Sequence, residues 1–268
     1  MSGEVITSRQ NPLCARFRKL AVSRAFREET GEFLCDSPKL LAEAAKWGAP
    51  LSAVAYTRRE LLPVGLPGDV RLVQVSEGVM EAISPAKTPQ GVVFSCKIPP
   101  PPEAEWLMPG RYLLLEGVQD PGNVGAVLRS ADAFGWEVFL LEGCADPYSP
   151  KTVRAAMGVH FRSEIVCTCL ERAAALVKAS GLPLYAAALG EDVDIRQTDL
   201  SNCAVIIGSE GRGVSGRALE LCTGTLKIPM EPCCESLNAA VAAGIVLWEG
   251  YRGGPSGRSL EANDARHT

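Results

Sequence analysis

The sequence predicts an α/β protein of two domains, of which the C-terminal domain is built on a parallel sheet. The chain has 268 residues, of which 47% are apolar, and this is enough to bury two modest cores. A proline run from Pro99 to Pro102 cannot maintain a ladder of backbone hydrogen bonds and divides the chain. After this run, strand-like and helix-like segments alternate, which is typical of βαβ units.

The N-terminal domain is expected to span residues 1–98. An Arg-rich amphipathic helix or pair of helices is predicted at 8–29, and a capped helix follows Ser37-Pro38. Strands are predicted at 51–56, 70–75 and 91–96, with a helix at 77–83. The first 27 residues are locally basic, which suits contacts with phosphate groups but equally a solvated helix face. Their cations are Arg9, Arg16, Arg18, Lys19, Arg24 and Arg27.

A linker is predicted at 99–110, followed by a C-terminal domain at 111–252. A strand at 111–117 leads into a helix at 124–134 that ends at Gly135, and a second strand follows at 136–141. Ser149-Pro150 begins a short helix, and a longer helix is predicted at 170–180. Further strands are predicted at 182–189, 203–207 and 225–230, before a final helix at 236–251. The polar tail at 253–268 is expected to be disordered.

Composition and charge argue against several protein classes. No run approaches the roughly 18 apolar residues of a membrane span, and the basic N-terminus lacks a signal-peptide core, so a cytoplasmic protein is expected. The ten cysteines form no C-x-x-C pair, so a metal site is not expected. Buried thiols are predicted instead at Cys14, Cys35, Cys96, Cys144, Cys203 and Cys222. The net charge of −4 argues against a uniformly basic surface.

The first candidate motif, EGVQDPGNVGAVLR, runs from a strand exit through a polar turn into a helix. Asn123 stands at a natural N-cap position. Arg129 lies outside the apolar stripe of the helix and can face a cleft at the carboxyl end of the sheet, where open α/β folds bind ligands. A capping asparagine and a solvent-facing arginine are the structural alternative.

The second motif, VIIGSEGRGVSG, follows an apolar strand. Its Gly211-x-Gly213-x-x-Gly216 pattern matches a dinucleotide fingerprint and would indicate a nicotinamide-dependent oxidoreductase. However, that fingerprint ordinarily opens the first βαβ unit, whereas this turn comes late in the chain. In the other interpretation, Gly208 lets a cofactor approach bare backbone, and Glu210 projects from the turn to hold a polar partner.

The third motif extends from IPM to SLN. A strand ends at Pro229, an irregular loop follows, and Ser236 begins a helix of small residues. Ser236 is most simply an N-cap, and Asn238 is most simply a solvated or capping side chain. The Ala-rich face of the helix permits close backbone approach, as at a subunit interface or beneath a ligand.

Together, the three motifs resemble those of the SpoU/TrmH family of RNA 2'-O-ribose methyltransferases in the SPOUT superfamily. The family patterns N-x5-R, G-x-E-x-x-G and I-P-M…S-L-N match Asn123 to Arg129, Gly208 to Gly213 and Ile228 to Asn238, in the family's order. The N-terminal region is similar to the ribosomal-protein-like substrate-binding domain of many such enzymes, through ITSRQNP and TGEFL. The sequence departs from the pattern at two sites. Asp36-Ser37 replaces a common E-G in the region expected to bind RNA, and Pro232 replaces a frequent glycine.

The resemblance implies a C-terminal SPOUT domain knotted as a trefoil, in which the last segment threads a loop, and a small N-terminal α/β RNA-binding domain. It implies S-adenosyl-L-methionine as cofactor and a homodimer in which RNA meets residues of both chains. The cofactor-binding residues would be Gly208, Ile228, Met230 and Leu237. Ribosomal RNA of the large subunit (23S) is favoured over tRNA by analogy. A catalytically silent RNA-binding ribosome-assembly factor is the alternative.

The resemblance also implies the catalytic residues Arg129, Asn123, Glu210, Ser236 and Asn238. A ribose 2'-hydroxyl is a poor nucleophile until it loses its proton. Because arginine stays protonated in proteins, Arg129 is expected to hold the adjacent RNA phosphate, whose oxygen, or a water, accepts the proton. Asn123 and Asn238 are expected to orient the ribose or Arg129. Glu210 would position the turn, and Ser236 would bind near the reacting centre or cap the helix.

Overall fold

The protein divides into two compact units in a computed structural model that describes residues 4–100, 105–188, 193–231, 233–234, 236–252 and 254. Unit 1 comprises Met1–Pro100 and Asp146–Arg162, and unit 2 comprises Pro101–Ala145 and Ser163–Thr268. The chain therefore crosses between units three times, where the sequence analysis expected one linker. Residues 101–104 of that linker, Pro232, and all of the predicted tail except Gly254 lie outside the described residues.

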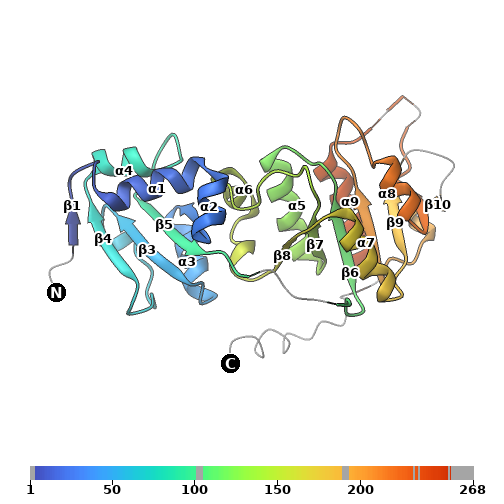
Figure 1. Cartoon of the computed structure of the whole chain (residues 1–268), viewed down its shortest axis with the longest axis horizontal. Coiled ribbons are helices and arrows are strands. Elements are labelled where there is room, and N and C mark those ends of the chain that lie inside the picture. Colours follow the sequence, from blue (N-terminus) through green and yellow to red (C-terminus); the bar gives the residue numbers. More distant parts are fainter. Residues whose placement is uncertain are drawn as a thin grey trace. The chain divides into compact units, whose positions relative to one another are not determined.

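Unit 1 is built on a five-stranded mixed sheet in the order β1-β4-β3-β5-β2, in which β5 runs antiparallel to β2 and β3 (Figure 1). Its strands are β1 Glu4–Ile6, β2 Glu32–Asp36, β3 Leu51–Tyr56, β4 Arg71–Val75 and β5 Val92–Lys97. Its helices are α1 Pro12–Val22, α2 Arg24–Thr30, α3 Pro38–Lys46, α4 Glu77–Ile83 and α6 Pro150–Ala156, with the 3-10 turns η1 Arg59–Leu61 and η2 Val159–Phe161. The helical region predicted at 8–29 is confirmed, and of the two forms expected it is the pair of helices, α1 and α2.

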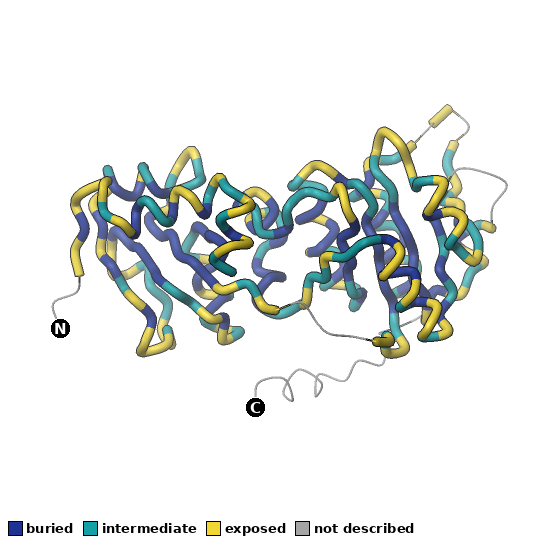
Figure 2. Tube along the Cα trace, viewed as in Figure 1, coloured by how far each residue is buried: buried dark blue, intermediate teal, exposed yellow. Residues whose placement is uncertain are grey.

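Two cores cover the two faces of this sheet, because alternate side chains of each strand point to opposite sides. Leu34 packs with Phe17 of α1 and Met80 of α4 on one face. Phe33 packs with Leu41 of α3 on the other face. Strands β2, β3 and β5 are buried along most of their length, whereas β1 and β4 also carry exposed residues (Figure 2).

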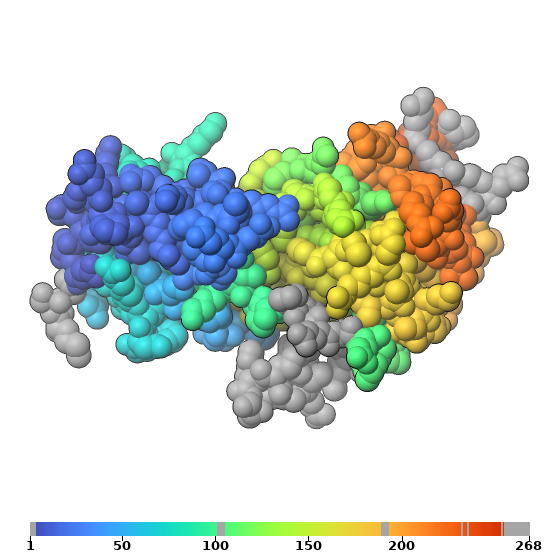
Figure 3. All heavy atoms as spheres, viewed as in Figure 1, coloured from blue at the N-terminus to red at the C-terminus, as the bar shows by residue number. Residues whose placement is uncertain are grey.

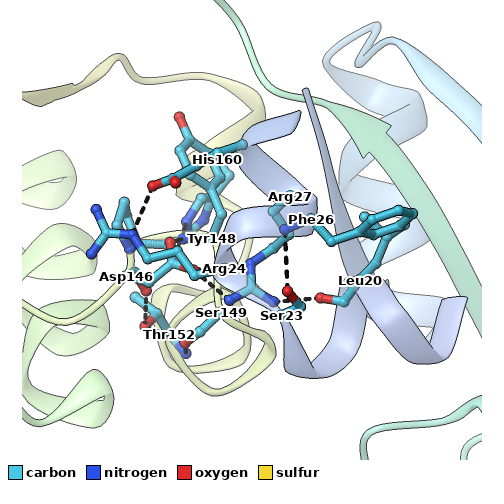
Figure 4. Close-up of polar contacts among 12 residues, drawn as sticks. Leu20, Ser23, Arg24, Phe26, Arg27, Asp146, Tyr148, Ser149, Thr152 and His160 are labelled. Atoms are coloured by element: carbon cyan, nitrogen blue, oxygen red, sulfur yellow. Dashed lines mark hydrogen bonds and ion pairs between the residues drawn. The ribbon is translucent and has the colours of Figure 1, made fainter. Parts of the chain in front are cut away.

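The segment 146–162 joins the second of these cores through its aromatic residues. The ring centroids of Phe33 and Tyr148 lie 5.2 Å apart, and Phe161 is part of the same buried cluster. At the start of the segment, Asp146 accepts a hydrogen bond from Nε of the buried Arg27 at 2.9 Å, and Arg27 also donates to the Leu20 carbonyl (Figure 4). This segment is therefore part of unit 1, although unit 2 precedes and follows it in sequence.

The Asp36-Ser37 departure has a structural explanation within unit 1. The carboxylate of Asp36 forms an ion pair with Arg154 of α6, with 2.8 Å between Oδ2 and Nη2. Ser37 has φ = 118°, a conformation that glycine adopts without strain and other residues rarely do. Ser37 also caps α3, because its hydroxyl accepts from the Leu40 N–H at 3.2 Å. The serine therefore combines backbone strain with a helix cap.

His160 is buried in the same aromatic cluster, with its Nε2 at 2.8 Å from the Pro147 carbonyl oxygen. A carbonyl only accepts hydrogen bonds, so Nε2 carries a proton. The buried Nδ1 has no hydrogen-bond partner among the described residues, so a second proton there would be unpaired and the ring is neutral. Burial lowers the pKa of His160 from 6.5 to about 4. Between these values, the unfolded chain binds a proton that the folded chain does not.

We predict that His160 makes unit 1 less stable in mild acid. Above pH 6.5, the histidine is neutral in both states and costs the folded state nothing. As the pH falls from 6.5 towards 4, the free energy of unfolding decreases, and the loss is roughly 2 kcal/mol at pH 5. The His160→Gln variant keeps a neutral donor and does not titrate. Urea denaturation at pH 7.5 and pH 5 should therefore show a free energy of unfolding that falls by about 2 kcal/mol more in the natural protein than in the variant. Equal losses would contradict this account of His160.

Unit 2 is a seven-stranded parallel sheet in the order β10-β12-β9-β11-β6-β7-β8, which confirms the predicted α/β class. Its strands are β6 Arg111–Leu115, β7 Glu137–Leu140, β8 Ile165–Cys167, β9 Leu184–Ala187, β10 Val193–Asp194, β11 Cys203–Ile207 and β12 Gly224–Lys227. Its helices are α5 Pro121–Phe134, α7 Leu170–Ala179, α8 Gly216–Leu221 and α9 Ala239–Arg252, with the 3-10 turn η3 Ile195–Gln197.

Helices cover both faces of this sheet. Helices α7 and α8 pack on the face that carries Leu114 and Ile206. Helices α5 and α9 pack against each other and contact β7 and β11, respectively. Gly250 of α9 is required there, because a Cβ at this position would lie 2.4 Å from Cζ2 of Trp136.

All ten cysteines are free. Four of the six predicted buried thiols are fully buried, and Cys144 and Cys222 are partly buried. Within the described ranges, no helix is both long and apolar enough to span a bilayer.

Candidate active site

The three motifs follow strands β6, β11 and β12 of the parallel sheet. Because parallel strands have their carboxyl ends at one edge, the three segments emerge from the same edge of unit 2. Strands β6 and β11 are neighbours in register, with Leu115 opposite Ile207. The first and second motifs therefore leave the sheet side by side.

Helix α5 begins three residues earlier than predicted, and the N-cap assignment of Asn123 is wrong. Asp120 is the N-cap, and its side chain accepts from the Asn123 N–H at 3.0 Å. Pro121 can begin the helix because its fixed φ suits the first turn and its missing N–H is not needed there. An aspartate directly before a proline is a helix-start signal that sequence reasoning missed.

With its capping role taken by Asp120, the Asn123 side chain contacts the second motif. Its Nδ2 donates a hydrogen bond to Oε1 of Glu210, which lies 87 residues further along the chain. Both side chains were predicted site residues, and the structure brings them together. Glu210 is exposed and Asn123 is half-buried, so this pair is accessible from solvent.

The loop that carries Glu210 turns tightly on itself. The Gly213 N–H donates to the Ser209 carbonyl at 2.9 Å, and Gly213 has φ = 65°. A Cβ on Gly208 would lie 2.0 Å from the backbone C and O of Gly213. The absent side chain of Gly208 therefore makes room for the loop itself.

Arg129 lies on the exposed side of α5, as its position outside the apolar stripe predicted. Among the residues that the structure describes, Arg129 has no ion-pair or hydrogen-bond partner. No described interaction joins it to Asn123 or Glu210. Its guanidinium is thus available to an external anion.

The N-cap assignment in the third motif also needs correction. Ser236 is exposed and precedes the helix, whereas the side-chain oxygen of Asn238 accepts from the N–H groups of Ala240 at 3.0 Å and Val241 at 3.3 Å. Asn238 is therefore the residue that caps α9, because its side-chain oxygen accepts from the first free N–H groups. The predicted cofactor-binding residues of this motif, Ile228, Met230 and Leu237, are each half-buried.

Helices α5 and α9 have the same length and run in the same direction. Each has 14 residues, and their carboxyl ends meet: Trp136, just after α5, donates from Nε1 to the Leu247 carbonyl at 3.1 Å, and the ring centroids of Phe134 and Tyr251 lie 5.5 Å apart. Their amino ends therefore lie towards the same edge of the sheet. This places Asn238 at the edge from which Asn123 and Glu210 emerge.

The basic residues of the N-terminal region fall into two groups. Three of them form ion pairs with acidic groups of unit 1, as Arg16–Glu32, Arg24–Glu28 and Arg27–Asp146. The other three, Arg9, Arg18 and Lys19, are exposed and form no ion pair with an acid that the structure describes. The residues of α1 and α2, coloured dark blue, make up much of the face of unit 1 that Figure 3 shows.

The tight packing at Gly208 predicts a large cost for adding one methyl group. In Gly208→Ala, the Cβ would overlap the loop backbone, so the free energy of unfolding should fall by about 1–3 kcal/mol. Gly211→Ala is the matched control in the same loop, because nothing lies within 4 Å of its Cβ position. Chemical denaturation of the two variants measures the difference. Equal stability of both would show that the loop does not pack as described.

Comparison with known proteins agrees with this arrangement of motifs. The profile of the SpoU rRNA Methylase family matches residues 110–248, and that of the MRM3-like substrate binding domain matches residues 11–93. The chain is 32% identical to the 23S rRNA (guanosine(2553)-2'-O)-methyltransferase RlmP of Bacillus subtilis (strain 168), over 91% of this chain and 97% of that protein. It is 31% identical to the mitochondrial rRNA methyltransferase 3 of Mus musculus, over 86% of this chain and 69% of that protein.

Solved structures resemble the whole chain as well. The AdoMet-bound rRNA methyltransferase from Sinorhizobium meliloti aligns with a TM-score of 0.85 at 29% identity, covering 93% of this chain and 98% of that one. The family profile spans more than half of this chain, and RlmP is aligned over nearly all of it. The protein therefore belongs to the SpoU/TrmH family of RNA methyltransferases.

Proposed function

We propose that this protein transfers a methyl group from S-adenosyl-L-methionine to a ribose 2'-hydroxyl of 23S ribosomal RNA. The observation that carries the proposal is the contact between Asn123 and Glu210, which joins two of the family's motifs. Asn123 lies on helix α5, which also carries Arg129, a residue without a described partner. The substrate class is supported by RlmP, whose name describes a 23S rRNA 2'-O-methyltransferase. The nicotinamide-dependent alternative has no support from the family.

The residues of the candidate site fit the proposed cofactor. Ile228, Met230 and Leu237 are half-buried, so apolar surface remains open at the edge of the sheet for an adenosyl group. The side-chain position of Gly208 is filled by the backbone of Gly213, so the proposed cofactor contacts are the N–H and C=O groups of the loop that Gly208 allows to turn. When bound, the cofactor would supply a methyl group on a sulfonium that is already activated for transfer.

Arg129 would act on the RNA. Its guanidinium stays protonated and can hold two oxygens of a phosphate, so we assign it to the phosphate next to the modified ribose. A phosphate oxygen or a water would accept the proton of the 2'-hydroxyl, while the fixed positive charge stabilises the developing alkoxide. The exposure of Arg129 and the absence of a described partner support this role.

The other motif residues would position the reacting groups. Glu210 holds Asn123, so the pair would fix the turn at which the ribose binds. The oxygen of Asn238 caps α9, which leaves its amide N–H groups to orient the ribose or Arg129. Ser236 is exposed ahead of that helix and is free to bind near the reacting centre.

Unit 1 would bind the RNA by its shape and phosphates, as is usual for structured RNA. Within the basic N-terminal region, we assign the phosphate contacts to Arg9, Arg18 and Lys19, because the other three cations are paired with acids of unit 1. The division into an RNA-binding unit and a methyltransferase unit follows the two family matches.

We also propose that unit 2 has the trefoil knot of the SPOUT superfamily. The ten free cysteines support a reducing compartment such as the cytoplasm.

Methyl transfer tests the proposed function directly. Purified protein with labelled S-adenosylmethionine should label unmodified 23S ribosomal RNA, and transfer RNA should remain unlabelled. Arg129→Ala and Arg129→Lys should each lower kcat by roughly 100-fold or more, because one lost transition-state contact of this kind costs that much. The control is Arg217→Ala, an exposed arginine paired with Glu220 on α8. No label in either RNA pool, with folded protein, would favour the silent RNA-binding alternative.

The homodimer is supported by an aromatic cluster on the outer side of α5 and α9. Phe134, Trp248 and Tyr251 lie with ring centroids 5.5–6.2 Å apart, and Trp248 is 51% exposed. Val241, seven residues before Trp248 on the same helix face, is 52% exposed. An exposed apolar helix face of this kind suits self-association.

We predict that Trp248→Glu converts a dimer to a monomer, because it places a charge in the proposed apolar interface. Sedimentation velocity should show the change in mass. Leu219→Glu is the matched control, since Leu219 is an exposed apolar residue of α8 on the opposite face of the sheet. The interface assignment fails if Trp248→Glu sediments as the natural protein does.

A further inference from the structure

Glu116 contacts both ends of the loop that forms the second motif. It is half-buried and directly follows strand β6. Its backbone N–H donates to the Ile207 carbonyl at 2.9 Å. Its carboxylate accepts two hydrogen bonds from Ser215, at 2.8 Å from the N–H and at 2.6 Å from the hydroxyl. One residue thus spans the start and the end of the segment 208–214.

The bonds of Ser215 make this connection specific. Its hydroxyl donates to Glu116 and accepts from the Ala218 N–H at 3.1 Å, so the serine also caps α8. A carboxylate offers two acceptor oxygens, which match the two donors of Ser215. Hydrogen bonds to an ionised acceptor are stronger than those between neutral groups. Glu116 therefore holds the point at which the loop becomes a helix.

Between these ends, Val214 packs against the hydrophobic core of unit 2, but the tip of the loop has few packing contacts. Residues Glu210 to Gly213 are exposed, so no buried apolar side chain anchors its tip. The tip is held by the bond from Asn123 to Glu210 and by the pairing of Ser209 with Gly213. A segment with few buried contacts depends on its polar contacts for order. Glu116 supplies the contacts at both ends of the loop. Asn123, seven residues after Glu116, supplies the contact at the tip.

We propose that Glu116 is a positioning residue, which acts through Ser215 to hold the second-motif loop in the conformation that binds the cofactor. This inference rests on the proposed function, because the cofactor-binding role of Gly208 belongs to it. Glu116 itself need not touch cofactor or RNA. Its loss should therefore lower cofactor affinity, because binding must then order the loop, and should lower RNA affinity much less, because the proposed phosphate contacts of unit 1 do not involve this loop.

The test is a calorimetric titration with S-adenosylhomocysteine, the product form of the cofactor, which requires no turnover. Glu116→Ala should weaken its binding by about tenfold, because both contacts to Ser215 are lost. Glu116→Gln should stay within about threefold of the natural protein, since an amide can accept from the N–H and donate to the hydroxyl of Ser215. Glu220→Ala, which removes an exposed carboxylate of α8, is the matched control.

Each outcome decides one question. If the natural protein does not bind S-adenosylhomocysteine, the proposed function fails. If it binds and Glu116→Ala binds equally well, the positioning role of Glu116 is overturned. Parallel losses of RNA affinity and cofactor affinity in Glu116→Ala would indicate a general loss of folding, and amide hydrogen exchange in the natural protein then decides.

If Glu116→Ala does not fold, amide hydrogen exchange in the natural protein decides instead. The Ser215 amide should be protected relative to that of Arg212 at the exposed tip of the loop, and Glu116→Gln should retain most of that protection. Equal exchange at Ser215 and Arg212 would show that Glu116 does not hold the end of the loop.

Discussion

The in-register pairing of strands β6 and β11 is the interaction on which the candidate site depends. Five residue pairs, from Arg111 opposite Cys203 to Leu115 opposite Ile207, fix the two strand exits beside each other. Both strands are buried on both faces, so a slip of one residue would break the close packing of their side chains against the helices on each side. The contact between Asn123 and Glu210 follows from it, because each residue lies a fixed number of positions after its strand.

The other end of β6 anchors the last helix. Arg111, the first residue of β6, is buried and donates from Nη1 to the Gly250 carbonyl at 2.7 Å. Burial lowers the pKa of Arg111, yet its positive charge suits the carbonyl end of a helix. Strand β6 thus fixes the carboxyl end of α9 at one edge of the sheet and leads into the first motif at the other. Because α9 runs parallel to α5, this anchoring also directs Asn238 towards the candidate site.

Much of the fold was predictable because local pattern determined it. Strand 203–207 and helix 77–83 were predicted with the observed bounds, since an unbroken apolar run and a capped amphipathic segment each have one interpretation. The start of α5 was misplaced because Asp120 and Asn123 are both good caps, and Pro121 decides between them. Short strands such as β1 and β10 were missed because they depend on distant partners. The packing of segment 146–162 in unit 1 likewise depends on tertiary contacts.

The sequence could name candidate residues but not their geometry, since the bond from Asn123 to Glu210 spans 87 residues. The central claim is that the methyl group is attached to a ribose oxygen, and the position of the label on the RNA tests it most directly. Alkali cleaves RNA through the free 2'-hydroxyl, so a 2'-O-methyl group protects the adjacent linkage. After alkaline hydrolysis of RNA labelled by this protein, the account predicts that the label is recovered in an alkali-resistant dinucleotide. Recovery of the label in mononucleotides would place the methyl group on a base and contradict the account.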